Sequence, residues 1–138
     1  MITTAIPDQA KIDLLPGGAH QPGDSYRCAL YENTATLDAT TPTYTILGEI
    51  AGTGYVAGGA SLTGFTVFDD TGSNSIVIQF DPVQWTSSTF NADGFIIYNT
   101  SKANKIMVIV AFGQTWYVTA GTFLLNLNAP GVIQWFKG

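Results

Sequence analysis

The stretch GFIIYNTSKANKIMVIVAF, from Gly94 to Phe112, decides the fold class. It contains two apolar runs, residues 95–98 and 106–112, which flank a polar loop over residues 99–105. Neither run alternates between apolar and polar residues, as a strand with one face in water would. Runs of this kind are typical of strands that are covered on both faces. The stretch therefore predicts two central strands joined by a polar loop.

Short strand-like runs bounded by turn residues continue in both directions from this stretch. Residues 61–68 and 75–80 enclose the turn cluster DDTGSN and predict a hairpin. The sequence NADG at residues 91–94 ends in Asp-Gly and predicts another turn. Further strands are expected at residues 26–31, 44–50, 84–90, 114–119, 121–127 and 132–136. About ten short strands with turns every 8–12 positions indicate an all-β sandwich or barrel.

The chain has 138 residues, a length that suits one domain. We expect a single β-sandwich over residues 25–138, jelly-roll-like or immunoglobulin-like, preceded by an N-terminal arm over residues 1–24. The arm is predicted to contain a short helix from Pro7 to Leu15. Pro7 suits the first helical position, and the sequence PGG at residues 16–18 ends the helix.

Charged residues make up 11% of the chain, against about 25% in a typical globular protein. The surface is therefore expected to consist of small polar residues and to be covered in part by a partner. A net charge of −5 with five basic residues argues against nucleic-acid binding and against an acidic membrane surface. The N-terminus lacks the basic and apolar regions of a signal peptide, which predicts synthesis in a cytoplasm.

The glycine-rich stretch GEIAGTGYVAGGASLTG, from Gly48 to Gly64, is close to a dinucleotide-binding fingerprint. That fingerprint needs a helix after the glycines, whose N-terminus holds the pyrophosphate. Here a strand-like run follows, and the next lysine is Lys102. We therefore interpret the glycines as meeting backbone needs, in tight turns and close approaches. The ring of Tyr55 is expected to pack onto them.

Residue types that carry catalysis or bind metals are scarce. His20 is the only histidine and Cys28 the only cysteine, so neither a hydrolytic triad nor a zinc site is expected. No spacing rule pairs Glu32 with Glu49 as glycosidase carboxylates. The remaining aspartates considered as calcium ligands lack the spacing of a calcium loop and are interpreted as turn residues: Asp69, Asp70, Asp81 and Asp93. We expect no enzymatic activity, no cofactor and no metal.

Several segments together resemble a recurring protein of tailed bacteriophages. They are YRCALY at residues 26–31, ATLDATT at residues 35–41, GEIAGTGYVAGG at residues 48–59, ADGFIIYN at residues 92–99 and SKANK at residues 101–105. The resemblance extends over residues 20–127. It implies a small β-sandwich that serves as a virion structural protein, carried on the head or on the tail.

The function expected from this resemblance is that of a head decoration, or cement, protein. Its partners would be the major capsid protein or other virion proteins, and it would form a symmetric homo-oligomer located in the virion. A tail, connector or fibre component, including a module that binds host glycans, remains the alternative. Apolar residues near the termini and exposed aromatics are the expected partner contacts: Ile6, Ile12, Leu14, Leu15, Trp116, Tyr117, Trp135 and Phe136.

Overall fold

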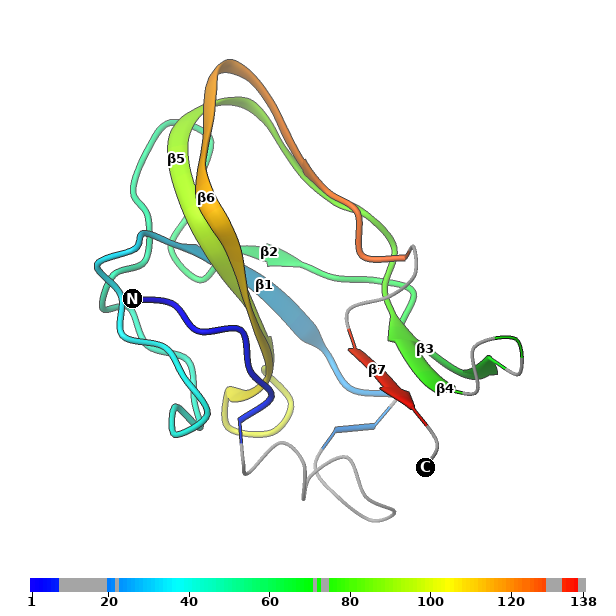
Figure 1. The fold of residues 1–138 in the computed structure, drawn as a ribbon. Helices are drawn as coiled ribbons and strands as arrows, with labels where there is room; N and C mark the ends of the chain where they lie inside the picture. Colours follow the sequence, from blue (N-terminus) through cyan, green and yellow to red (C-terminus); the bar gives the residue numbers. More distant parts are fainter. Residues whose placement is uncertain (8–19, 22, 71, 73–74, 129–132, 137–138) are drawn as a thin grey trace.

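A computed structural model describes residues 1–7, 20–21, 23–70, 72, 75–128 and 133–136. The described chain contains seven β-strands arranged in two antiparallel sheets (Figure 1). The first sheet has the order β2 (Ala60–Ser61), β1 (Tyr26–Tyr31), β5 (Val83–Asn99) and β6 (Lys105–Leu125). The second has the order β3 (Thr66–Asp70), β4 (Ser75–Gln79) and β7 (Ile133–Phe136).

The two sheets pack together, which confirms the predicted all-β sandwich. The strand order of the four-stranded sheet differs from the A-B-E-D order of immunoglobulin domains. The predicted strand at residues 26–31 is confirmed, and β3 and β4 form a hairpin as predicted. Its first strand is shifted, however, because β3 begins at Thr66 instead of residue 61 and includes Asp69 and Asp70 of the predicted turn. The predicted N-terminal helix lies outside the described residues apart from Pro7.

The largest departure from the predicted pattern is the β5–β6 ribbon, which replaces five expected short strands with two long ones. The turn predicted at residues 91–94 is wrong, because β5 runs through it. Register shifts between the two strands let the ribbon continue and bend, and Ser87, Gly113 and Ala120 have positive φ along it. In Figure 1 the ribbon arches from the loop at residues 100–104 over the top of the molecule toward β3 and β4. Bulges increase twist and bending in this way.

The strand predicted over residues 44–50 is also wrong. This segment forms a tight turn, and its backbone pairs with the sheet through isolated bridges, Tyr31 to Glu49 and, just before the segment, Thr43 to Lys105. Tyr44 is held by its side chain, because its ring stacks on that of Tyr98 with centroids 4.7 Å apart. Stacking and turn hydrogen bonds therefore replace the strand ladder in this segment.

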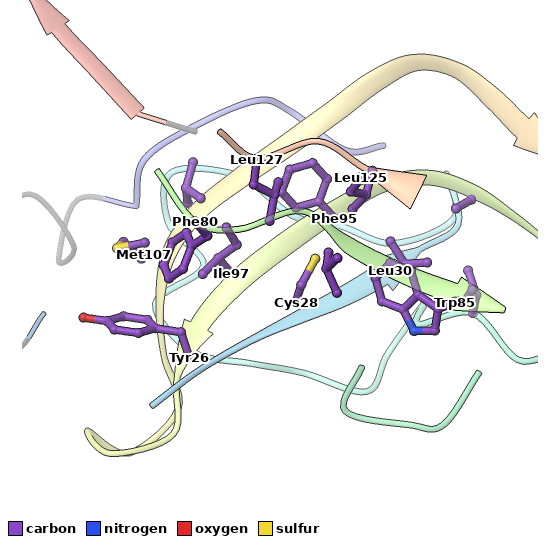
Figure 2. Packing of buried hydrophobic residues seen from close by; sticks show 14 of the residues in the cluster. Tyr26, Cys28, Leu30, Phe80, Trp85, Phe95, Ile97, Met107, Leu125 and Leu127 are labelled. Atoms are coloured by element: carbon purple, nitrogen blue, oxygen red, sulfur yellow. The ribbon is translucent and has the colours of Figure 1, made fainter. Parts of the chain in front are cut away.

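The central strands are covered on both faces, as their composition predicts. One face of the four-stranded sheet packs on the first core, which lies between the sheets and includes Cys28, Ile97 and Phe80 (Figure 2). The opposite face packs on a second core that includes Ala29 and Ile96. Neighbouring residues in β1 and β5 thus enter different cores, because side chains alternate along a strand.

The first residues of the chain cover the second core. Ile2 is buried there, and Ala5 pairs with Ile109 through two backbone hydrogen bonds of 2.9 and 2.8 Å. The N–H of Thr3 also donates to the carbonyl oxygen of Leu37 at 2.9 Å. Deleting the first fifteen residues would therefore uncover a core, so partner binding is better tested by point substitutions.

Candidate functional site

The glycine-rich stretch is organised around the carboxylate of Glu49. The hydroxyls of Tyr44 and Tyr55 each donate to it at 2.5 Å, and the N–H of Gly58 donates at 2.7 Å. The hydroxyl of Tyr55 also accepts the N–H of Leu30 at 3.0 Å, which ties the stretch to β1. Burial and the hydrogen bond to Glu49 both raise the pKa of Tyr55. This hydrogen-bonded group, the Glu49 cluster, explains why the stretch holds its shape.

The expected packing of Tyr55 onto the glycines is wrong. Its ring lies against Trp85 and Phe90, with centroid distances of 6.1 and 6.0 Å. The glycines serve backbone geometry, as interpreted from the sequence: Gly59 has φ of +80°, and a Cβ at that position would overlap the carbonyl oxygen of Cys28. Only glycine, which has no Cβ, allows the two backbones to approach each other this closely.

A second polar cluster joins the loop before β1 to the end of β5. The carboxylate of Asp24 accepts hydrogen bonds from Asn99 at 2.8 Å and from Lys102 at 3.0 Å, and Asn99 also contacts the ring nitrogen Nδ1 of His20 at 3.3 Å. His20 is buried. Burial acts to raise the pKa of Asp24, but the hydrogen bonds from Asn99, Lys102 and the N–H of Gln21 hold it below its usual value.

Replacing Asp24 with asparagine should weaken the fold most at neutral pH. A carboxyl whose pKa is lower in the folded state stabilises the fold above its unfolded-state pKa, and this stabilisation is lost as the pH falls through the folded value. We expect Asp24→Asn to lower the free energy of unfolding at pH 7 by roughly 1–2 kcal/mol, with the half-exposed Lys102 contributing little. The difference should begin to shrink as the pH falls below about 4 and vanish only below the lowered folded-state pKa of Asp24. Urea unfolding across this range measures it, with the exposed Glu32→Gln as control; a loss independent of pH contradicts it.

Two further carboxylates of the described chain have hydrogen-bond partners of their own. Asp81 accepts the hydroxyl of Thr63 at 3.0 Å, and Asp93 accepts the N–H of Asn33 at 2.9 Å. Within the described part of the chain, no three His, Cys, Asp or Glu side chains gather closely enough to hold a metal ion. Cys28 is fully buried, and burial raises the pKa of its thiol.

The distal half of β6 carries the most prominent exposed aromatic side chains. Trp116 is 49% exposed, Tyr117 71% and Leu124 60%. We call Trp116, Tyr117 and Leu124 the β6 surface. It includes both residues of β6 that were expected as partner contacts.

Side chains alternate along β6, so the neighbours Trp116 and Tyr117 lie on different faces of the ribbon. Trp116 lies opposite Ala92, which is fully buried, whereas Tyr117 lies opposite Asn91, which is exposed. Residues directly opposite in an antiparallel pair share a face. Trp116 therefore extends the core face of the ribbon, where its ring is left half uncovered, and Tyr117 stands on the outer face.

The three residues of the β6 surface contribute to the lining of an open hollow of about 310 Å³. Its lining includes Phe112 and Phe123, whose rings lie 6.2 Å apart by their centroids. Phe123 in turn packs on the buried Phe90 at 5.3 Å. The hollow, which we call the β6 hollow, is thus an extension of the first core that the described residues leave uncovered. No charged residue occurs between Lys105 and Lys137 in the sequence, so this face is neutral.

The other residues expected as partner contacts are placed differently. Ile6 is half-buried and packs against the first core. Trp135 and Phe136 belong to β7, in the other sheet from Trp116. Three expected contacts lie outside the described residues: Ile12, Leu14 and Leu15.

Sequence reasoning missed a second exposed apolar group. Ile46 is 64% exposed, Leu47 77% and Val56 74%. The available signal was the position of Ile46 and Leu47 directly before Gly48, where a tight turn exposes its central residues. The run was instead interpreted as a strand, in which one of each pair of neighbours would be buried.

Among the described residues, no helix is long and apolar enough to span a membrane. Comparisons of the chain with protein-family models, with curated proteins and with solved structures gave no match.

Proposed function

We propose that this protein is a non-enzymatic structural component of a tailed-bacteriophage virion, which binds the outer head lattice as a decoration protein. The observation that carries the proposal is the β6 surface: exposed aromatic and aliphatic side chains on a rigid sheet, in a part of the sequence without charge. Aromatic residues dominate the binding energy of protein interfaces. A surface of this composition supports contact with other proteins.

The residues that carry the phage resemblance have defined roles in this fold. Gly59 permits the approach to β1, Glu49 joins two tyrosines and Asn99 binds Asp24. The resemblance therefore concerns residues that build the whole domain. This supports a shared architecture with the phage family, from which the proposed role follows.

Stabilisation of the head would follow from mass action. A subunit that binds only the assembled lattice lowers the free energy of that lattice relative to free subunits. A non-enzymatic role fits the buried positions of Cys28 and His20, which make neither side chain an accessible nucleophile or base.

Copy number per particle tests the proposal. Quantitative mass spectrometry on gradient-purified virions should find on the order of hundreds of copies if the protein tiles the head in symmetric sets. A few copies would assign it to the tail, fibre or connector, and absence from the particle would overturn the proposal.

Polar substitutions on the β6 surface should weaken binding to heads that lack the protein. We expect Tyr117→Ser with Leu124→Ser to reduce co-sedimentation about tenfold or more, because interface hot spots are worth 2 kcal/mol or above. Val67→Ser, at an exposed apolar position of β3, is the matched control and should bind normally. Equal binding of both variants would exclude the β6 surface as the contact.

One feature favours a second candidate, a fibre module that binds neutral glycans. Trp116 is half-exposed beside the β6 hollow, whose lining also includes Tyr117 and Thr122. Aromatic rings with neighbouring hydroxyls offer a flat apolar face and hydrogen bonds to a sugar ring. A glycan array decides between the two: binding that Trp116→Ala removes would favour the fibre role.

A further inference from the structure

The pairing of the β5–β6 ribbon is irregular at Asp93. The flanking pairs are Ala92 with Trp116 on one side and Gly94 with Ala111 on the other. Four residues of β6, 112–115, therefore lie opposite the single residue Asp93 of β5. An excess of residues in one strand disrupts the ladder locally and redirects side chains, which is why bulges often adjoin functional sites.

An open hollow of about 250 Å³ lies at this irregularity. Water occupies about 30 Å³ per molecule in the liquid, so the hollow has room for one long side chain of another molecule. Its lining includes the apolar residues Ile2 and Ala111 and the polar residues Asn33, Asp93, Gln114 and Thr115. We call it the Asp93 hollow. None of its described lining residues belongs to the β6 hollow or to the β6 surface.

The carboxylate of Asp93 is held at both of its oxygens. The hydroxyl of Thr115 donates to Oδ1, and the N–H of Asn33 donates to Oδ2 at 2.9 Å. An ionised carboxylate accepts about four hydrogen bonds, so each oxygen keeps capacity for a further donor. The two hydrogen bonds fix the carboxylate before a ligand arrives, which lowers the entropy cost of binding.

No cation of the chain matches the charge of Asp93. Within the part of the chain that the structure describes, no lysine, arginine or histidine side chain forms an ion pair with it. The α-amino group of Met1, next to the lining residue Ile2, donates instead to the carbonyl oxygen of Ala35 at 2.8 Å. Asp93 is half-buried, so a positive charge brought to it is attracted more strongly than in bulk water. The net charge of −5 also attracts cationic ligands to the molecule.

We infer that the Asp93 hollow binds an arginine side chain presented by a partner protein. A guanidinium group carries its N–H donors in a planar fork, which matches the two oxygens of a fixed carboxylate. The side-chain amide oxygens of Asn33 and Gln114 accept the remaining N–H groups. The aliphatic stem of the arginine packs on Ile2 and Ala111. This contact is separate from the proposed lattice contact, because it uses none of the residues of the β6 surface.

Titration of the isotope-labelled chain with N-acetyl-arginine amide, followed by amide NMR shifts, tests the inference. We expect saturable shifts at residues 33, 93 and 113–115, with a dissociation constant in about the millimolar range that one charge-assisted contact supports. N-acetyl-citrulline amide has nearly the same shape without the charge and should bind about tenfold more weakly or worse. The inference is overturned if these residues do not shift or if the citrulline derivative binds equally well.

Two matched variants assign the binding to the hollow. Asp93→Asn keeps the size of the side chain and removes its charge, so it should weaken binding of the arginine derivative about tenfold or more. Asp81→Asn removes a carboxylate that accepts the hydroxyl of Thr63 outside the hollow, and it should bind as the unsubstituted chain does. Undiminished binding by Asp93→Asn would overturn the site.

A lysine derivative separates the guanidinium group from positive charge alone. N-acetyl-lysine amide presents a compact ammonium group without the planar fork, so it should bind more weakly than the arginine derivative. Equal binding of the two would overturn the assignment of arginine. Both ligand comparisons use the unsubstituted chain, so they remain decisive if Asp93→Asn disturbs the fold. Their failure would leave the binding of heads by the β6 surface untouched.

Discussion

Replacing Gly59 with alanine should prevent the chain from folding. Gly59 has φ of +80°, and a Cβ there would overlap the carbonyl oxygen of Cys28, which is backbone at the centre of β1. Relief would require β1 to move away from the glycine-rich stretch, and Cys28 is fully buried in the first core. We expect the free energy of unfolding to fall by more than about 4 kcal/mol, a loss typical of severe steric or packing defects. Circular dichroism and urea unfolding measure it.

Gly113→Ala is the matched control for this substitution. Gly113 has nearly the same φ, +77°, but a Cβ there would meet no atom within 4 Å. Gly113→Ala should therefore lower the free energy of unfolding only by the cost of a left-handed conformation, about 1–2 kcal/mol. The difference between the two variants isolates the steric clash from the backbone preference. Equal stabilities would mean that β1 and the stretch separate easily, contrary to the structure.

Replacing Glu49 with alanine should have the second-largest effect on stability. The substitution leaves the hydroxyls of Tyr44 and Tyr55 and the N–H of Gly58 without their acceptor. A buried donor that loses its partner costs about 1–3 kcal/mol, so we expect a combined loss of roughly 3–5 kcal/mol. Urea unfolding at neutral pH measures this loss.

Tyr44→Phe provides the comparison for Glu49→Ala. It removes one of the three donors and leaves the carboxylate with two, so it should cost only about 1 kcal/mol. A loss of stability for Glu49→Ala no greater than for Tyr44→Phe would contradict the cluster as a cooperative unit.

The fold class was predictable because the central strands are apolar without alternation. Ile96 and Ile97 are neighbours in sequence, and both are fully buried, in different cores. Only a strand covered on both faces allows this arrangement. Ile2 and Leu37 belong to the second core. No strand pattern in the sequence predicted their positions, because they pair through an isolated bridge.

The lengths of the strands were not predictable from local patterns. The sequence NADG is a strong turn signal, but here Asp93 accepts the hydroxyl of Thr115 and the N–H of Asn33. Gly94 lets the chain approach the carbonyl of Val110 closely. These tertiary contacts therefore stabilise the NADG residues as a bulge within a continuous strand instead of as a turn. A turn and a bulge share their residue types, because both need tolerant backbone and short polar side chains.

The candidate site was predictable only in part. Trp116 and Tyr117 were singled out as aromatics, and the structure shows them exposed. The β6 hollow depends on the register of the ribbon, and the exposure of Ile46 and Leu47 depends on the turn at Gly48. Neither arrangement can be predicted from the local sequence, because the exposure of a side chain depends on which distant segments cover it.

Pairing of the N-terminal segment has a consequence for synthesis of the chain. The hydroxyl of Thr4 accepts the N–H of Ala111 across a separation of 107 residues. The ribosome adds about 5–20 residues per second, so several seconds pass between synthesis of the N-terminal segment and synthesis of its partner, Ala111. Its apolar residues remain uncovered until β6 emerges from the exit tunnel. The second core therefore cannot close before residue 111 has been made, and a slow stretch of translation before that point would prolong exposure to chaperones and proteases.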